Sequence, residues 1–99
     1  MSEQEVPKAV RVRQIELVDG KGQVYMVLGR QYDVPHITVF DNAGQVRCEI
    51  GLYDDGPGMV LLDERGKTRA ILALGEDGEP SMSLFDGISR LPRKTITIP

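Results

Sequence analysis

The sequence predicts an all-β protein made of four antiparallel β-hairpins. Its clearest sign is an internal repeat, since ITVFDNAGQVRCEIG at 37–51 is followed 22 residues later by MVLLDERGKTRAILA at 59–73. The aspartates that end apolar runs keep the same period, at Asp19, Asp41, Asp63 and Asp86. Units of about 22 residues that each hold two short apolar runs predict about eight strands, and no window has the pattern of a helix.

Each repeated aspartate is expected to begin a reverse turn. Glycine stands three residues after the first three of them, at Gly22, Gly44 and Gly66. In a type I turn the first residue favours Asp, whose carboxylate accepts hydrogen bonds from turn N–H groups, and the fourth favours Gly, which adopts a positive φ without strain. The D-x-x-G spacing therefore predicts a hairpin connection with a bulge at the glycine.

A second series of turns is expected to return the chain between hairpins. Its aspartates are Asp33, Asp55 and Asp77, and Pro35, Pro57 and Pro80 lead into the next apolar runs. The fourth unit departs from the pattern, because Ser89 stands where the turn glycine is expected and Pro92 interrupts its second strand. An atypical last unit is expected to cap the array and protect its edge.

Alternation of apolar residues predicts that every strand turns one apolar face to a common interior. The alternating pairs before each turn are Ile15 and Leu17, Ile37 and Val39, Met59 and Leu61, and Met82 and Leu84. The opposite face is only partly polar, because Phe40, Leu62 and Phe85 directly precede their aspartates.

Two architectures fit this pattern. The hairpins can form a meander that curls into a small barrel or sandwich with the apolar face inside. Alternatively, they can stack as a solenoid or as part of a symmetric oligomer that buries Phe40, Leu62 and Phe85 against a neighbouring chain.

The 99 residues divide into a polar N-terminal arm at 1–12 and a single repeat domain at 13–99. The chain has no Trp, two Phe and three Tyr, so its interior must be built from Val, Ile, Leu and Met. Because a small domain with a thin core and one cysteine has no disulfide to support it, we expect a homo-oligomer.

Charge and cysteine content exclude several classes of function. The net charge is −3 and the basic residues are dispersed, which argues against binding of nucleic acid. Cys48 is the only cysteine, so the chain cannot form an internal disulfide, and the sequence is compatible with a reducing compartment. The N-terminus has no apolar run and no stretch reaches ~18 apolar residues, so we expect no signal peptide, no membrane span and a cytoplasmic location.

The segments FDNAGQVR, LDERGKTR and DDGPGMVLLD resemble an uncharacterised bacterial β-hairpin repeat with the pattern D-x-x-G-x-x-R followed by D-G-P-G. The chain is also similar, more distantly, to the hairpin repeats of Rhs-type YD arrays and of choline-binding modules. The similarity spans residues 15 to about 86 and implies hairpin geometry. The aromatic cages of choline-binding modules have no counterpart here, so that activity is not implied.

The acidic residues are interpreted as turn formers. Calcium loops place several ligands in one loop as D-x-[DN]-x-[DN]-G, a pattern this chain lacks. Asp54, Asp55, Glu76 and Asp77 are dense enough that two neighbouring loops could share a cation, but solvated turn acids are the favoured interpretation. We expect no metal site and no cofactor.

The recurring Arg47 and Arg69, with Tyr25 at the same position of the first unit, are the candidate binding residues. They could line a groove for an anion. The favoured alternative is that their stems cover the sheet and their heads pair with Glu49 or with a carboxylate of the next unit.

Cys48 and His36 could form a nucleophile and base pair, but no third orienting residue is recognisable. We expect Cys48 to be a small buried apolar residue and His36 to be exposed. The sequence therefore predicts a non-enzymatic structural or protein-interaction module whose binding residues are Tyr25, Arg47, Arg69, Phe40, Leu62 and Phe85. The alternative is a module that binds a small ligand or carbohydrate on the arginine-bearing face or at the acidic loops.

Overall fold

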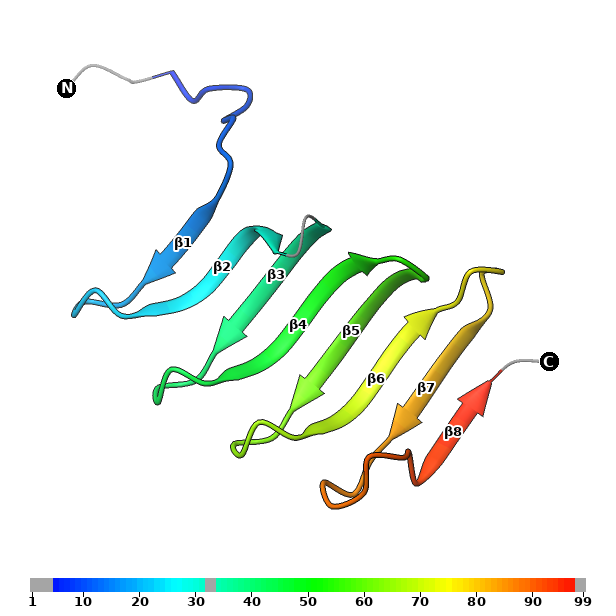
Figure 1. Cartoon of the computed structure of the whole chain (residues 1–99). Helices are drawn as coiled ribbons and strands as arrows, with labels where there is room; N and C mark the ends of the chain where they lie inside the picture. The colour runs from blue at the N-terminus through cyan, green and yellow to red at the C-terminus, as the bar shows by residue number, and fades with distance from the viewer. Residues whose placement is uncertain (1–4, 32–33, 98–99) are drawn as a thin grey trace.

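A computed structural model, which describes residues 5–31 and 34–97, shows one antiparallel sheet of eight strands whose spatial order follows the chain (Figure 1). The strands are β1 (Ile15–Val18), β2 (Val24–Gln31), β3 (Val34–Phe40), β4 (Val46–Tyr53), β5 (Gly56–Leu62), β6 (Thr68–Leu74), β7 (Pro80–Leu84) and β8 (Lys94–Thr97). The all-β meander is confirmed. The sheet does not close into a barrel, because β1 and β8 are its two free edges.

The D-x-x-G turns form as the spacing predicts. Gly22, Gly44 and Gly66 have φ near +80° and each donates its N–H to the carbonyl of the preceding Asp at 3.0 Å. The Asp19 carboxylate accepts the N–H groups of Lys21 and Gln23, and the other two turns repeat this pattern. The strand register also shifts beside each turn, at Tyr25, Arg47 and Arg69, so this bulge lies three residues after the glycine and not at the glycine as expected.

Return turns connect the hairpins at the opposite end of the strands. Asp54 and Asp55 link β4 directly to β5, and residues 75–79 link β6 to β7. The Asp77 carboxylate accepts the N–H of Glu79 in the second of these turns. Asp33, expected in the first return turn, lies outside the described residues, as do residues 1–4 of the arm and the last two residues of the domain.

One face of the sheet is apolar across all eight strands, and we call it the apolar face. Cross-strand pairing places its residues in three rows, because side chains alternate between the faces of each strand. The row beside the return turns includes Pro35, Leu52, Pro57, Leu74 and Pro80. The two central rows include Ile15, Leu17, Met26, Leu28, Ile37, Val39, Cys48, Ile50, Met59, Leu61, Ala70, Leu72, Met82, Leu84 and Ile96. The only charged residue in these two central rows is Lys94, in the edge strand β8.

The opposite side, which we call the mixed face, carries polar and apolar residues together. Its central row is Glu16, Val27, Thr38, Glu49, Val60, Ile71, Ser83 and Thr95. In β5, Val60 is half-buried by its neighbours on the mixed face, whereas Leu61 on the apolar face is 45% exposed. The mixed face is thus covered more fully by its own side chains than the apolar face, where Ile50, Leu61 and Leu72 are exposed.

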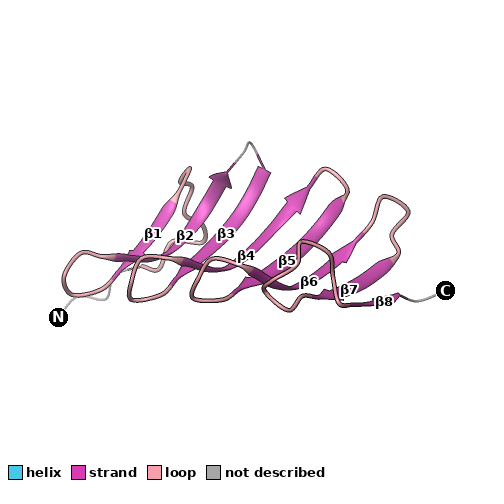
Figure 2. Cartoon of the chain, turned by 60° about the horizontal axis from the view of Figure 1, so that its bottom comes forward, coloured by secondary structure: helices cyan, strands magenta, loops and turns pink. Residues whose placement is uncertain are grey.

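The sheet is a single layer, so the expected interior does not form within one chain (Figure 2). Among the described residues no apolar side chain is fully buried. The Cα radius of gyration is 17.2 Å, against about 13 Å for a compact domain of this length. Cys48, expected to be buried, is therefore only half-buried, since the described strands form one sheet and none of them lies over the apolar face.

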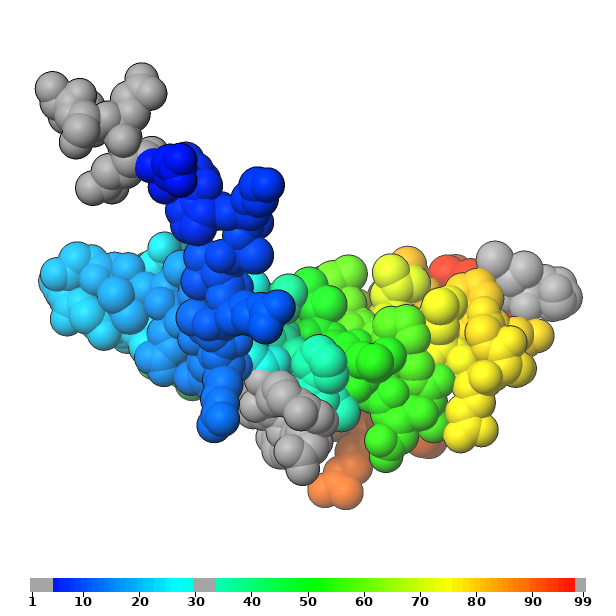
Figure 3. Space-filling view, turned by 90° about the horizontal axis from the view of Figure 1, so that it is seen from above, coloured from blue at the N-terminus to red at the C-terminus, as the bar shows by residue number. Residues whose placement is uncertain are grey.

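Both ends of the array are short strands of four residues with no regular structure beyond them in the described residues. The arm before β1 is exposed from residue 5 onward and projects from the row of hairpins (Figure 3). Pro92 and Arg93 directly precede β8, and Lys94 is its first residue. Proline and charged residues at a sheet edge discourage pairing with another strand. None of the described segments is a helix of the length and hydrophobicity needed to cross a membrane.

Candidate functional site

The residues predicted to bind a partner lie in one row on the mixed face, beside the D-x-x-G turns. Two kinds of residue alternate along this row. Those at the bulges are Tyr25, Arg47 and Arg69, and those directly before an Asp are Phe40, Leu62 and Phe85. Phe40, Leu62 and Phe85 are half-buried there, and Tyr25 is exposed. The structure therefore brings all six together as a line and not as a cleft.

The two arginines of this row bind groups of their own chain. Arg47 Nε donates a hydrogen bond to the Leu62 carbonyl at 2.9 Å, and Arg69 Nε donates to the Phe85 carbonyl at the same distance. Their Nη1 atoms lie 3.5 and 3.6 Å from the carboxylates of Asp41 and Asp63. The carboxylate partner is thus in the same unit, and not Glu49 or an adjacent unit as expected from sequence.

This arrangement makes each arginine a link between consecutive hairpins. The bulge at Arg47 lies in the pairing of β4 with β3. On the other side of β4, the guanidinium supplies a donor to the Leu62 carbonyl, just beyond the last β4–β5 pair of Cys48 with Leu61. Tyr25 lacks a guanidinium, and in the first unit Gln23 Nε2 instead donates to the carbonyl of Asn42 at 3.2 Å. The recurrence of arginine is explained by this structural contact.

The turn carboxylates are held in their ionised form. In Asp41 the backbone N–H of Gln45, then that of Ala43 and the Arg47 guanidinium, lower the pKa below its ordinary value. The pKa of Asp63 is lowered by the backbone N–H of Lys67, then by that of Arg65 and by the Arg69 guanidinium. The pKa of Asp86 is also lowered, chiefly by the N–H groups of Ser89 and Ile88.

These lowered pKa values predict a loss of stability in acid. A carboxyl group with a depressed folded-state pKa stabilises the fold fully above its unfolded value of about 3.9, and loses this contribution as the pH falls through the folded value. We expect the urea midpoint to stay level above about pH 5 and to fall below about pH 4. Asp63→Asn should show a shallower fall. A midpoint that rises below pH 4 would contradict this role of the turn carboxylates.

His36 is buried, which corrects the expectation that it is exposed. It is 5% exposed, and its Nε2 lies 3.1 Å from Glu49 Oε2. The cause is its position opposite Gly51, which has no side chain: a Cβ built there would lie 2.8 Å from His36 Nδ1. The imidazole therefore lies on the mixed face over the backbone of β4, a placement that strand position alone does not reveal.

Tyr53 covers this buried histidine. Its ring meets the imidazole edge to face, with the ring centroids 5.5 Å apart. Desolvation, followed by the nearby Glu49 charge, raises the pKa of the Tyr53 hydroxyl. The cluster of His36, Glu49 and Tyr53 joins β3 to β4, and His36 and Thr38 are the most buried described residues of the mixed face, at 5% and 4% exposed.

Cys48 and His36 lie on opposite faces of the sheet, although their strands are neighbours. Cys48 pairs with Val39 and Leu61 on the apolar face, whereas His36 pairs with Gly51 on the mixed face. The sheet backbone separates them, so the thiol and imidazole cannot act as a nucleophile and base pair within one chain. The acidic return turns also gather no cation site: within 5–31 and 34–97, no three His, Cys, Asp or Glu side chains come close enough to hold a metal ion.

Comparison with known proteins returns no relative: neither a protein-family model nor a curated protein sequence matches this chain. Two candidate binding surfaces are therefore identified from the structure alone. One is the apolar face, which the sequence pattern predicted as an interior. The other is a pocket at the last hairpin, for which the only sequence signal is the irregular fourth unit.

Proposed function

We propose that this chain is a non-enzymatic structural and protein-interaction module that works as a homo-oligomer, with its copies packed through their apolar faces. The observation that carries the proposal is the uncovered apolar face, on which Ile50, Leu61 and Leu72 are each more than 40% exposed. Monomeric soluble proteins rarely expose an apolar patch that spans a whole sheet. Such a face requires a cover, and a second sheet is the usual one.

The exposed area supports a second copy as the cover. The chain exposes 8325 Å², about 2,700 Å² more than the roughly 5,600 Å² typical of a folded monomer of this mass. The arm accounts for part of this excess. A stable dimer needs about 800 Å² from each partner, so the excess is large enough for an obligate interface.

The shape of the apolar face also suits packing against itself. In one of its rows the large Leu61 stands between the smaller Cys48 and Ala70. A shallow hollow of about 360 Å³ lies among Ile50, Met59 and Leu72. Two such faces stacked about 10 Å apart can interdigitate as in a β-sandwich, with large side chains of one sheet entering the hollows of the other.

The mixed face then remains on the outside, where it can contact a protein partner. The separation of Cys48 from His36 supports a non-enzymatic role, and the single thiol suits a cytoplasmic setting. The alternative of a ligand groove at Tyr25, Arg47 and Arg69 is less well supported, because both guanidinium groups are used within the chain.

Light scattering coupled to size exclusion tests this proposal. We expect a mass that is a multiple of 11.0 kDa at micromolar concentration. A single mass of one chain, together with the circular dichroism spectrum of a folded β-protein, would overturn it.

A further inference from the structure

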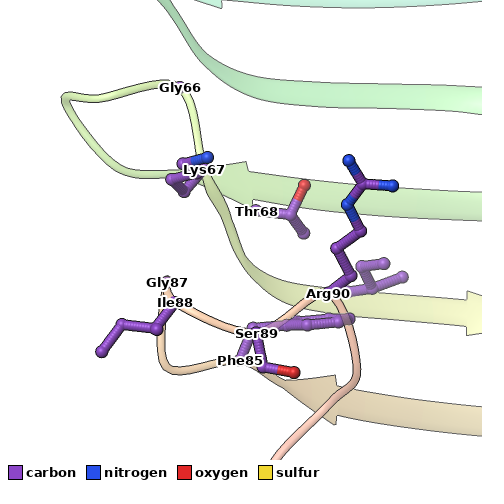
Figure 4. A pocket seen from close by; sticks show the side chains of 9 residues that line it. Gly66, Lys67, Thr68, Phe85, Gly87, Ile88, Ser89 and Arg90 are labelled. Atoms are coloured by element: carbon purple, nitrogen blue, oxygen red, sulfur yellow. The ribbon is translucent and has the colours of Figure 1, made fainter.

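The last hairpin differs from the others in the length of its turn. The first three D-x-x-G hairpins connect their strands with five residues, at 19–23, 41–45 and 63–67, whereas β7 and β8 are connected by the nine residues 85–93. The longer loop turns back beside the start of β6 and encloses a pocket of about 370 Å³ against it (Figure 4). This volume lies within the usual range for small-molecule sites.

The pocket combines an apolar surface with two positive charges. Phe85 and Ile71 contribute apolar surface from the mixed face, and Ile88 of the loop borders the pocket. Lys67 and Arg90 line the same pocket, together with the hydroxyl-bearing Thr68. Figure 4 shows the Arg90 side chain extending from the loop on one side of Thr68, with Lys67 on the other side of Thr68.

Both cations are available to a ligand. In the part of the chain that the structure describes, neither the Lys67 ammonium nor the Arg90 guanidinium forms an ion pair. Two acids of the adjoining turns are engaged elsewhere, since Asp63 pairs with Arg69 and Asp86 lies 3.7 Å from Arg93. No acidic residue lines the pocket. Its electrostatic character is therefore positive.

The loop that forms the pocket is held in place before any ligand arrives. Asp86 Oδ1 accepts the N–H groups of Ile88 and Ser89 at 2.8 and 3.0 Å, and Ser89 Oγ accepts the N–H of Leu91. Gly87 has φ +82° and packs against the Arg69 stem, where an added Cβ would lie 3.3 Å from Arg69 Cδ. Such preorganisation lowers the entropic cost of binding, because the loop does not have to be ordered when a ligand binds.

Ile88 is 91% exposed in spite of this ordered setting. Figure 4 shows its side chain directed away from Phe85, Thr68 and Arg90, so Ile88 borders the pocket only at its edge, and the apolar wall is formed by Phe85 and Ile71. The charge and the apolar surface lie at the same site, so the matching ligand carries both features.

We infer that this pocket binds a small organic anion with an apolar body, such as an aryl or alkyl carboxylate. The carboxylate lies between Lys67 and Arg90 and accepts hydrogen bonds from them, and the apolar body lies against Phe85 and Ile71. The site is on the mixed face, so it stays open when the apolar faces pack together. All of its lining residues come from one chain, so a second copy contributes no residue to it.

NMR titration of ¹⁵N-labelled protein with 1-naphthylacetate tests this inference. We expect saturable shifts at the amides of Thr68, Gly87 and Ile88. 1-Naphthylacetamide, which has the same body without the charge, and acetate, which has the charge without the body, should each bind at least about tenfold more weakly, a difference of about 1.4 kcal/mol.

Two variants give the matched comparison. Lys67→Gln combined with Arg90→Gln should weaken 1-naphthylacetate binding at least about tenfold, whereas Arg65→Gln, which removes a cation from the same turn outside the pocket, should leave it within about twofold. The inference is overturned if no saturable shift occurs at these amides up to about 10 mM, well above a millimolar dissociation constant. Equal affinity for the neutral analogue, for acetate or in the double variant also overturns it.

Discussion

Leu61→Lys is expected to dissociate the oligomer, whereas Val60→Lys in the same strand is expected to leave it intact. The two residues are adjacent in β5 and point to opposite faces. Within one chain Leu61 is the more exposed of the two, so a monomer would tolerate lysine better at 61 than at 60. Assembly through the apolar face reverses that order, which makes the pair a discriminating comparison.

The expected effect of Leu61→Lys is large because the change acts in every copy. Each leucine loses about 2 kcal/mol of burial, and each lysine places an ammonium group in an apolar interface. The dissociation constant should rise at least about 100-fold, corresponding to about 2.7 kcal/mol. At position 60 the lysine lies opposite Glu49, and its stem can follow the sheet to solvent.

Sedimentation velocity of the two variants over a range of concentrations measures this effect. If Val60→Lys dissociates the protein and Leu61→Lys does not, the interface is on the mixed face and the assignment of the apolar face is wrong.

Gly56→Ala is expected to be the most destabilising small substitution in the sheet. Gly56 has φ +137°, a conformation that alanine rarely adopts, and a Cβ would lie 2.7 Å from the backbone oxygen of Leu74. Strain in the backbone and this contact with the neighbouring strand together should cost at least about 3 kcal/mol.

Gly78→Ala provides the control, because this glycine also has a positive φ but nothing lies within 4 Å of an added Cβ. It should cost only the conformational term, about 1 kcal/mol. Urea unfolding of both variants at one protein concentration compares them. Equal losses would mean that β5 and β6 do not approach as closely at Gly56 as described.

Local sequence rules predicted the turns and the strand order well. Asp and Gly at fixed spacing specify a turn through contacts within five residues, so Asp41 and Gly44 could be interpreted without knowledge of the rest of the fold. Because the hairpins are consecutive and similar, a meander is one of the two architectures that the sequence predicts, and the stacked arrangement is the other.

The position of the interior could not be predicted in the same way. Alternation at Met59 and Leu61 reveals that a face is apolar, but it does not reveal whether the cover comes from the same chain or from another one. In this protein the sheet stays open, and the face expected to line a barrel is exposed within the single chain.

The partners of individual side chains depended on cross-strand register. His36 is buried because it lies opposite Gly51, and Arg47 reaches the Leu62 carbonyl because a bulge displaces it. A pairing shift of one residue would change both contacts. The pocket at Arg90 likewise depends on how a nine-residue loop folds back, for which Ser89 and Pro92 gave only the sign of an irregular turn.

The most direct test of the account is the thermal midpoint of unfolding as a function of protein concentration. A single-layer sheet without a buried apolar core should be folded only in the assembly, so the midpoint should rise steadily with concentration. A midpoint that is unchanged over a hundredfold range of concentration, with the protein folded and of single-chain mass throughout, would show that the sheet is stable alone and would contradict assembly through the apolar face.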